Sequence, residues 1–226
     1  MRTIGILQCR MGSSRLQGKS MLPLAGKPMC TNIMERLLDV VSFDELVVAV
    51  PPTKDDLLIV AEAVKLGINV FVGSEDDLID RYYQCAKLFD AELVVRLCGD
   101  NPMKEPEEVD RIIDYAERKA QNGILYSNTE NINNNRYPDG LGAEVYTMQT
   151  LEWMHKNLKG ERYREHPHKY FHDNGLVETI KCPDEFAYPK IKLDINTGMD
   201  YQYIEAIYNK VGSNEFHITD YVGGLM

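Results

Sequence analysis

The sequence predicts an α/β fold with a mostly parallel central sheet flanked by helices. Short apolar runs of strand length alternate with longer segments whose apolar residues recur at helical spacing, and this alternation continues as far as Ala120. Prolines and glycines separate the segments, as at Pro51-Pro52 and Gly67. A strand–helix–strand order of this kind implies parallel strands covered by helices.

The first half of the chain supplies strand-like runs at 4–8, 45–50, 69–72 and 92–97. The first is uniformly apolar except at its end, which suits a buried strand. Pro51-Pro52 stops the second run. The fourth, ELVVRL, ends at Gly99-Asp100.

Helices are expected beside these strands, over 28–41, 55–66, 76–89 and 106–120. Pro28 suits the first turn of the first helix, and Gly67 ends the second. Ser74 can cap the third helix, with Asp77 in its first turn. The fourth helix is strongly charged but has apolar residues on one face, namely Val109, Ile112, Ile113 and Ala116.

The second half is less regular. Strands are expected at 124–127, 142–146, 177–182 and 190–195. Helices are expected over 151–158, 162–173 and 199–211. The Asn-rich segment 128–135 is polar and predicts an exposed loop. We expect one α/β domain over 1–226, with an excursion across 130–180.

Composition narrows the class of protein. The chain has 226 residues, 44% hydrophobic and 27% charged, and a formal charge of −10. This charge argues against a nucleic-acid partner, which would require a basic face. No apolar stretch reaches the length of a membrane span, and Met1 leads into a strand without a signal peptide. The five cysteines are scattered and odd in number, which favours a reducing cytoplasm.

The most informative segment is 8–19, QCRMGSSRLQGK, which directly follows the first strand. Arg10, Arg15 and Lys19 are interleaved there with glycines and serines. Small residues let backbone N–H groups face an anion, and the cations can surround it, so the segment suits a polyphosphate. Ligands of open α/β sheets also lie beyond strand carboxyl ends. The alternative is a solvated basic turn. The segment matches neither a P-loop nor a G-x-G-x-x-G fingerprint.

Two further segments offer metal ligands. Asp100 follows a strand and should lie at the same sheet edge as the basic loop. Mg²⁺ prefers one or two carboxylates together with phosphate oxygens. In KLDINTGMD, Asp194 and Asn196 share one face of an extended strand and could complete the site. The alternative for Asp100 is a turn or helix cap, and Asn196 or Thr197 could open the following helix.

Two segments offer contacts for an acceptor. RYPDGLGAEVY contributes Asp139 and Glu144, and RYREHPHKYFH contributes Arg164 and His166. Arg164 and His166 suit an anionic acceptor, although a solvated charged helix face is an equal alternative. The histidines of the second segment do not predict zinc, because their spacing is not HExxH and no cysteine is near.

Together these segments resemble the cytidylyltransferases of the spore-coat-polysaccharide SpsF type, which are related to the CMP-sialic-acid and CMP-Kdo synthetases. The resemblance covers most of the chain. It rests on QCRMGSSRLQGKSMLPLAGKPM, GSEDDLIDRYYQCAK, VVRLCGDNPMKEP, YPDGLGAEVY, REHPHKYFHDN and LDINTGMDYQYI. Such ordered matches are specific for the family but not for the acceptor.

The resemblance implies a fold like that of nucleotide-diphospho-sugar transferases and a Mg²⁺-dependent reaction with CTP. It implies that Arg10, Arg15 and Lys19 hold the triphosphate, and that Asp100, with Asp194 or Asn196, holds the metal. The other nucleotide contacts that it implies are Gln8, Met11, Gly12, Ser13, Gly73, Ser74, Asp77 and Arg81. The acceptor contacts are Asp139, Glu144, Arg164 and His166.

Two positions depart from the family pattern. Gln17 replaces the usual proline, which is a small change. Asn196 stands where the family usually has aspartate, and a neutral amide is a poorer Mg²⁺ ligand than a carboxylate. Either Asp194 takes over, or one carboxylate and the phosphates suffice, or activity is reduced.

The resulting expectation is a single nucleotidyltransferase domain that moves CMP from CTP to a small anionic acceptor and releases pyrophosphate. The acceptor is an acidic sugar, a sugar phosphate or another phosphorylated metabolite, in the synthesis of cell-surface polysaccharide precursors. The alternatives are use of another nucleoside triphosphate, or a catalytically silent nucleotide-binding protein. A homodimer is expected through 130–180, where Tyr137, Tyr163, Tyr170 and Phe171 are taken to be exposed.

Overall fold

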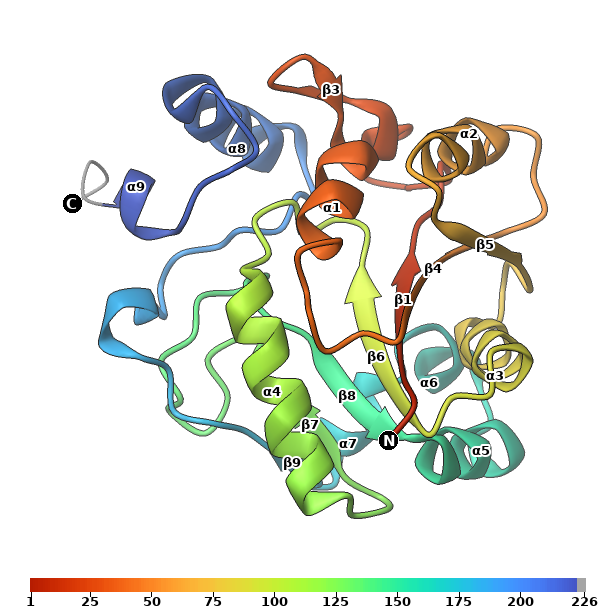
Figure 1. Ribbon diagram of the computed structural model, residues 1–226. Helices are drawn as coiled ribbons and strands as arrows, with labels where there is room; N and C mark the ends of the chain where they lie inside the picture. Colours follow the sequence, from red (N-terminus) through yellow and green to blue (C-terminus); the bar gives the residue numbers. More distant parts are fainter. Residues whose placement is uncertain (223–226) are drawn as a thin grey trace.

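A computed structural model describes residues 1–222 and contains a seven-stranded sheet between layers of helices (Figure 1). The order across the sheet is β5-β4-β1-β6-β8-β7-β9. The bounds are β1 Thr3–Gln8, β4 Glu45–Val50, β5 Asn69–Val72, β6 Leu93–Cys98, β7 Leu125–Ser127, β8 Glu144–Thr147 and β9 Val177–Glu178. Within this sheet of the described residues, β8 runs antiparallel to its neighbours, β6 and β7, while the other pairs are parallel. The predicted fold class, a mostly parallel α/β sheet flanked by helices, is therefore confirmed.

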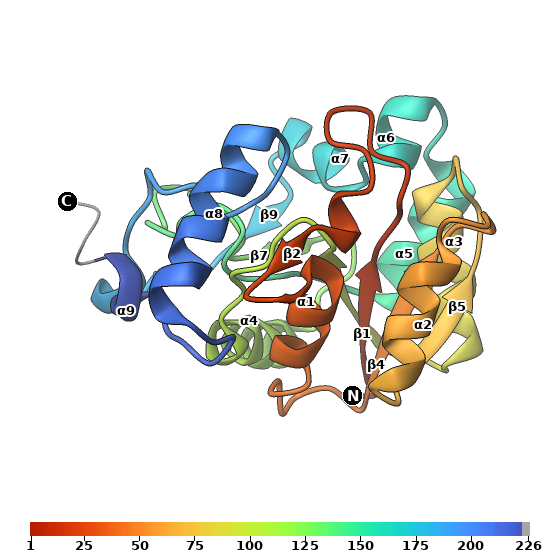
Figure 2. The same cartoon turned by 90° about the horizontal axis from the view of Figure 1, so that it is seen from above.

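Helices cover both faces of the sheet (Figure 2). One face packs against α1 (Met29–Leu37), α2 (Leu57–Lys65), α4 (Pro106–Lys119) and α8 (Gly198–Val211). The other packs against α3 (Leu78–Leu88), α5 (Met148–Asn157) and α7 (His168–Asp173), with α6 (Glu161–Glu165) beside α3. The shorter elements are η1 Lys19–Met21, β2 Pro23–Leu24, β3 Lys27–Pro28, η2 Asp184–Phe186 and α9 Thr219–Val222. Within the described residues, none of the helices has both the length and the apolar character that a membrane span requires.

The strand sequences alternate between the two cores. In β1, Ile6 joins the core under α3 and α5, whereas Leu7 joins the core under α1 and α4. Val47 and Val48 in β4 divide in the same way. This follows because successive side chains of a strand point to opposite faces. Because β5, β4, β1 and β6 are parallel, their carboxyl ends lie at one edge of the sheet, and ligands of such folds bind at this edge.

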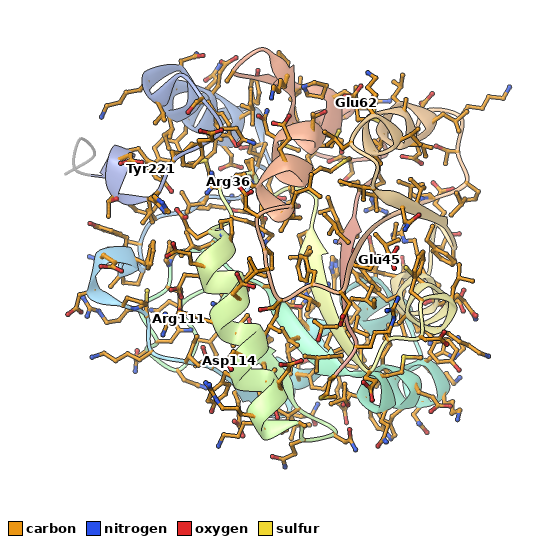
Figure 3. The ribbon with its side chains drawn as sticks, in the orientation of Figure 1. Arg36, Glu45, Glu62, Arg111, Asp114 and Tyr221 are labelled. Atoms are coloured by element: carbon orange, nitrogen blue, oxygen red, sulfur yellow. The ribbon has the colours of Figure 1, made fainter. Side chains whose placement is uncertain are left out.

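Arg36 of α1 ties the C-terminal part of the described chain to the start of α4 (Figure 3). Its Nε donates to the carbonyl of Lys104 at 2.6 Å, and its Nη1 donates to the carbonyl of Asn214 at 2.7 Å. The buried Glu105 carboxylate lies 3.4 Å from Arg36 Nη2 and accepts from the backbone of Ile218. These bonds fix the segment before α4, which carries Lys104.

Three expected elements differ from the structure. The predicted helix over 162–173 is wrong, because it divides into α6 and α7 at Pro167. A residue before proline is disfavoured in helical conformation, and His166 has φ −128° and ψ 74°. The predicted strand 190–195 is also wrong, since this segment forms only a bridge between Lys192 and Asp139. The predicted strand 177–182 shortens to β9.

The excursion is more buried than its composition suggested. Asn128 is fully buried and its side chain bonds the carbonyl of Glu108 and the amide of Ala143. The expectation that 128–135 is an exposed loop is therefore wrong at Asn128 and Asn135. Tyr137 and Phe171 are fully buried as well, so they cannot form an exposed aromatic surface.

Candidate active site

A cavity of about 420 Å³ lies at the carboxyl ends of β1 and β6. Six separate segments line it: the N-terminal loop, the segment that begins α3, the end of β6 with the turn after it, the region from Thr129 to Glu144, the α6–α7 junction and the turn before α8. The predicted site residues that line it are Gln8, Arg10, Ser13, Arg15, Lys19, Arg81, Asp100, Asp139, Glu144, His166, Asp194 and Asn196. The fold thus brings together residues that are far apart in sequence.

The N-terminal loop is shaped by backbone bonds at its base. Gly18, whose φ is +69°, donates from its amide to the carbonyl of Met11 at 3.1 Å. The Met11 amide in turn donates to Asp56 Oδ1 at 2.7 Å, and Thr53 donates to the other oxygen of Asp56. Glycine tolerates this left-handed backbone conformation without steric cost. Asp56 therefore anchors the loop, although nothing in the sequence pattern indicated it.

Two cations of the loop reach across the cavity. Lys19 Nζ lies 3.0 Å from Asp100 Oδ2 and 2.8 Å from the carbonyl of Ile195, and its side chain is 11% exposed. Arg15 Nη2 donates to Asn196 Oδ1. The Arg10 side chain is 46% exposed and lies 3.4 Å from Glu165 on α6. The loop is therefore held against both the turn after β6 and the turn before α8.

Gly99 allows β6 to end close to β1. A Cβ at this position would lie only 2.5 Å from the carbonyl oxygen of Gln8, so a side chain would force the strand ends apart. The Gly99 amide instead donates to that carbonyl at 2.9 Å. Asp100 is thereby presented directly beside the loop, and its own carbonyl accepts from the Ile195 amide at 2.7 Å.

The turn before α8 supplies the second carboxylate. Asp194 Oδ1 lies 3.0 Å from Lys192 Nζ, and Asp194 Oδ2 accepts from Asn196 Nδ2. The same lysine lies 3.2 Å from Asp200, the residue that closes a capping box with Thr197. Burial opposes ionisation of Asp200, but bonds from Thr197 and Asn196 and the Lys192 ammonium outweigh it and lower its pKa to about 2. Thr197 thus opens α8, as one alternative in the sequence predicted.

The donor set of this edge fits a magnesium ion. Asp100, Asp194 and Asn196 all contribute oxygen atoms to one cavity. Across residues 1–222 there is no cluster of three or more histidine, cysteine or acidic side chains that could form a complete protein cage. Mg²⁺ typically uses one or two carboxylates and takes its remaining ligands from water and phosphate.

The opposite wall contains a buried ion pair. Arg96 and Glu144 face each other across β6 and β8, with Arg96 Nη1 at 2.6 Å from Glu144 Oε2, and both are about 95% buried. Burial opposes ionisation of Glu144, but Arg96 outweighs it and lowers its pKa. At Asp139, burial and then the nearby Asp194 and Glu130 carboxylates raise the pKa to about 6. His166 lines the same wall, and burial lowers its pKa.

Arg164 lies elsewhere. Its guanidinium Nε donates to Asp77 Oδ2 at 2.8 Å, and neither residue lines the cavity. The expectation that Arg164 faces an acceptor does not match this position. Met11, Gly12, Gly73 and Ser74 are likewise outside the lining. Asp77 is the cap of α3, accepting from Asp80, while Ser74 accepts from the Asp77 amide.

Arg81 does reach the cavity although it is only 3% exposed. Burial lowers its pKa, and within residues 1–222 its Nε and Nη1 have no hydrogen-bond partner. A Cβ at Gly73 would lie 2.9 Å from Arg81 Cγ, so the glycine provides the room for this side chain. Gly73 thus supports the site from behind.

Several lining residues were not predicted. The clearest are Arg96, Lys104, His168 and Lys169. The position of Arg96 could have been inferred from the sequence, because a charged residue inside the apolar run ELVVRL needs a buried partner. No sequence pattern indicated Lys104. It is 1% exposed, and its ammonium donates to the carbonyl of Gly142.

The chain matches a family model described as cytidylyltransferase over residues 4–216. It belongs to the cytidylyltransferase family. The spore coat polysaccharide biosynthesis protein SpsF of Bacillus subtilis is 30% identical to this cytidylyltransferase. The match covers 92% of the present chain and 86% of SpsF. The predicted SpsF-type resemblance is therefore confirmed, and the chain is a CTP-dependent nucleotidyltransferase.

Solved structures agree. A cytidylyltransferase from Leptospira borgpetersenii is 29% identical, with a TM-score of 0.88 over 99% of this chain and 93% of that one. A CMP:2-keto-3-deoxy-manno-octonic acid synthetase complexed with CTP has a TM-score of 0.72 over 93% of this chain and 100% of that one. Because the identity to the synthetase is 17%, this second similarity supports the fold of the cytidylyltransferase and nothing about its substrates.

Proposed function

We propose that this enzyme transfers CMP from CTP to a small anionic acceptor, with Mg²⁺ as its metal and pyrophosphate as the second product. The acceptor is an acidic sugar, a sugar phosphate or another phosphorylated metabolite, and the product serves the synthesis of a cell-surface polysaccharide. One observation supports this above all: Arg15 and Lys19 reach into the same cavity as Asp100 and Asp194. The chain functions in this proposal as one domain.

In this reaction the N-terminal loop holds the triphosphate. Arg10, Arg15 and Lys19 supply positive charge, and the small Gly12 lets phosphate oxygens approach the backbone, while the Ser13 amide donates to the Met11 carbonyl at 3.0 Å. Arg15 and Lys19 offset the charge that grows on the leaving pyrophosphate. The nucleoside end lies toward the segment that begins α3, against Gln8 and Arg81, which line the cavity, with Met11, Gly73, Ser74 and Asp77 outside the lining.

Asp100 and Asp194 hold the metal in this proposal, with Asn196 beside them. When bound, Mg²⁺ supplies charge neutralisation on the phosphate oxygens. Asn196 has a second task, because its amide accepts from Arg15 and donates to Asp194. A guanidinium on one side and a carboxylate on the other orient that amide in one way only.

The acceptor lies against Asp139, Glu144 and His166. An acceptor oxygen forms a bond to the α-phosphorus in line with the bond that breaks to pyrophosphate. The protein needs no covalent nucleophile, because positioning and charge neutralisation supply most of the acceleration. An acceptor that is already a phosphate is ionised at neutral pH and needs no general base, whereas a sugar hydroxyl must give its proton to a general base as it attacks. Arg164 acts at a distance, by holding α6 to the cap of α3 through Asp77.

Replacing Lys19 with alanine tests the proposal. We expect pyrophosphate release with CTP, Mg²⁺ and a panel of phosphorylated and acidic acceptors to fall by about a hundredfold, as loss of one transition-state charge contact does. Lys65→Ala is the matched control, because Lys65 lies on α2 with a largely exposed side chain and outside the cavity. Equal rates for the two variants would remove Lys19 from the mechanism.

The same assay separates the alternatives. Thermal shifts with CTP, UTP, GTP and ATP report the preferred base. Tight CTP binding without pyrophosphate release across the whole panel would identify a silent nucleotide-binding protein instead.

We further propose a cytoplasmic homodimer that pairs through 130–180. All five cysteines are free thiols, which suits a reducing compartment. Trp153 is 42% exposed and packs with Tyr170, which in turn packs on Tyr163, leaving aromatic surface on α5, α6 and α7. A monomeric mass by light scattering at assay concentrations would contradict the dimer.

A further inference from the structure

Both carboxylates of the metal-binding edge are already paired with cations of the chain itself. Lys19 Nζ lies 3.0 Å from Asp100 Oδ2, and Lys192 Nζ lies 3.0 Å from Asp194 Oδ1. The two lysines come from different segments, Lys19 from the N-terminal loop and Lys192 from the segment before α8. Neither pair is remote from the other, because the Lys19 ammonium also bonds the carbonyl of Ile195, next to Asp194.

Lys19 is the more buried partner of the Lys19–Asp100 pair. The lysine side chain is 11% exposed and the aspartate side chain is 31% exposed. An ion pair in this setting is screened less by salt than a surface pair. A divalent cation that arrives alone must displace the Lys19 ammonium from the carboxylate and leave it with only the neutral Ile195 carbonyl as a partner, which is costly for a largely buried charge.

We infer that Lys19 occupies the place of the metal on Asp100 until the nucleotide arrives, and that the enzyme therefore admits its divalent cation together with the triphosphate. A triphosphate provides the anion to which Lys19 can move, so that the Asp100 carboxylate is released as the cation enters. Lys192 has the corresponding position on Asp194, but it keeps a second carboxylate partner, Asp200, at 3.2 Å. Lys192 can thus yield one oxygen of Asp194 without becoming unpaired.

This inference rests on the proposed function, but its test uses no nucleotide turnover. The probe is Mn²⁺ alone, with free Mn²⁺ measured by electron paramagnetic resonance in the absence of any nucleotide. We expect Lys19→Met to bind Mn²⁺ about tenfold or more tightly than the wild type, because a competing charge at hydrogen-bond distance has been removed. Lys65→Met, on α2, should bind Mn²⁺ as the wild type does.

Two further variants test whether the gain in Mn²⁺ affinity comes from Asp100 and whether it depends on correct folding. Adding Asp100→Asn to Lys19→Met should abolish the gain, since the gain is assigned to that carboxylate. Lys19→Gln drops the charge but keeps a donor for the Ile195 carbonyl, and it replaces Lys19→Met if thermal melting shows that the methionine variant is unfolded. Adding CTP should tighten Mn²⁺ binding more in the wild type than in Lys19→Met.

An Mn²⁺ affinity of the folded neutral variant that equals or falls below that of the wild type would overturn the inference. So would a gain that survives Asp100→Asn. Either result is separable from failure of the proposed function, which is read from pyrophosphate release by the wild-type enzyme with CTP and acceptor.

Discussion

His168 is a histidine that the cavity wall keeps uncharged. Burial, followed by the positive charge of Arg96, lowers its pKa from 6.5 to about 4, and the neighbouring Glu144 only partly offsets this. Between these two values the unfolded chain binds a proton that the folded chain does not. The contribution of His168 to stability is therefore present above pH 6.5 and is lost as the pH falls toward 4.

The lowered pKa of His168 predicts how the His168→Gln variant differs from the wild type in the pH dependence of its stability. The free energy of unfolding of the wild type should fall from pH 7 to pH 5 by about 2 kcal/mol more than that of the variant. Urea unfolding of both proteins at pH 5, 6, 7 and 8 provides the measurement, with the difference at pH 8 as the baseline. Parallel curves for the two proteins over this range would show that His168 titrates normally in the fold.

At the scale of single residues, the sequence predicted those groups whose chemistry depends on local pattern. Arg15, Lys19 and Asp100 follow strand ends or stand among small residues, and the structure places all three at one cavity. Lys104 and Asp56 could not be predicted in this way. Each is positioned by a tertiary bond, to the Gly142 carbonyl and the Met11 amide respectively, and neither bond leaves a periodic or spaced signal.

At the scale of elements, the contact between Arg164 and Asp77 joins α6 to α3. Arg164 Nε donates to Asp77 at 2.8 Å, and Arg164 Nη1 donates to the carbonyl of His155 at 3.0 Å, at the end of α5. One guanidinium thereby fixes three helices on the same face of the sheet. Because α6 leads into the segment that carries His166 and His168, this contact sets one wall of the cavity.

A double-mutant cycle measures this contact. Arg164→Met and Asp77→Asn should each lower the free energy of unfolding by about 1–3 kcal/mol, since each leaves a partly buried charge or donor unpaired. The double variant should lose clearly less than the sum of the single losses. Strict additivity in urea unfolding would mean that the two side chains do not interact in solution.

Elements were predictable where periodicity and local chemistry agreed. The strands of the parallel half and the helices α1 to α4 lie close to their expected positions because their apolar residues recur at the right spacing. The segment 190–195 shows the limit of this approach. Leu193 and Ile195 are fully buried, but the segment forms a single bridge, between Lys192 and Asp139, so the predicted strand did not form.

At the scale of the whole molecule, the sheet gathers the ends of distant segments at one edge (Figure 1). The loop after β1, the turn after β6 and the turn before α8 are separated by up to 181 residues at the Arg15–Asn196 contact. An overall charge of −10 surrounds a cavity into which Arg10, Arg15, Lys19 and Arg81 all reach. These four side chains offer a bound anion positive charge inside an acidic molecule.

The most direct test of this account is a crystal structure of the enzyme with CTP and Mg²⁺. We predict that the triphosphate lies in the cavity, with phosphate oxygens within about 3 Å of Lys19 Nζ and of the Arg15 guanidinium. We also predict that Lys19 has left Asp100. A nucleotide bound outside this cavity, with Lys19 and Arg15 still on Asp100 and Asn196, would contradict the account.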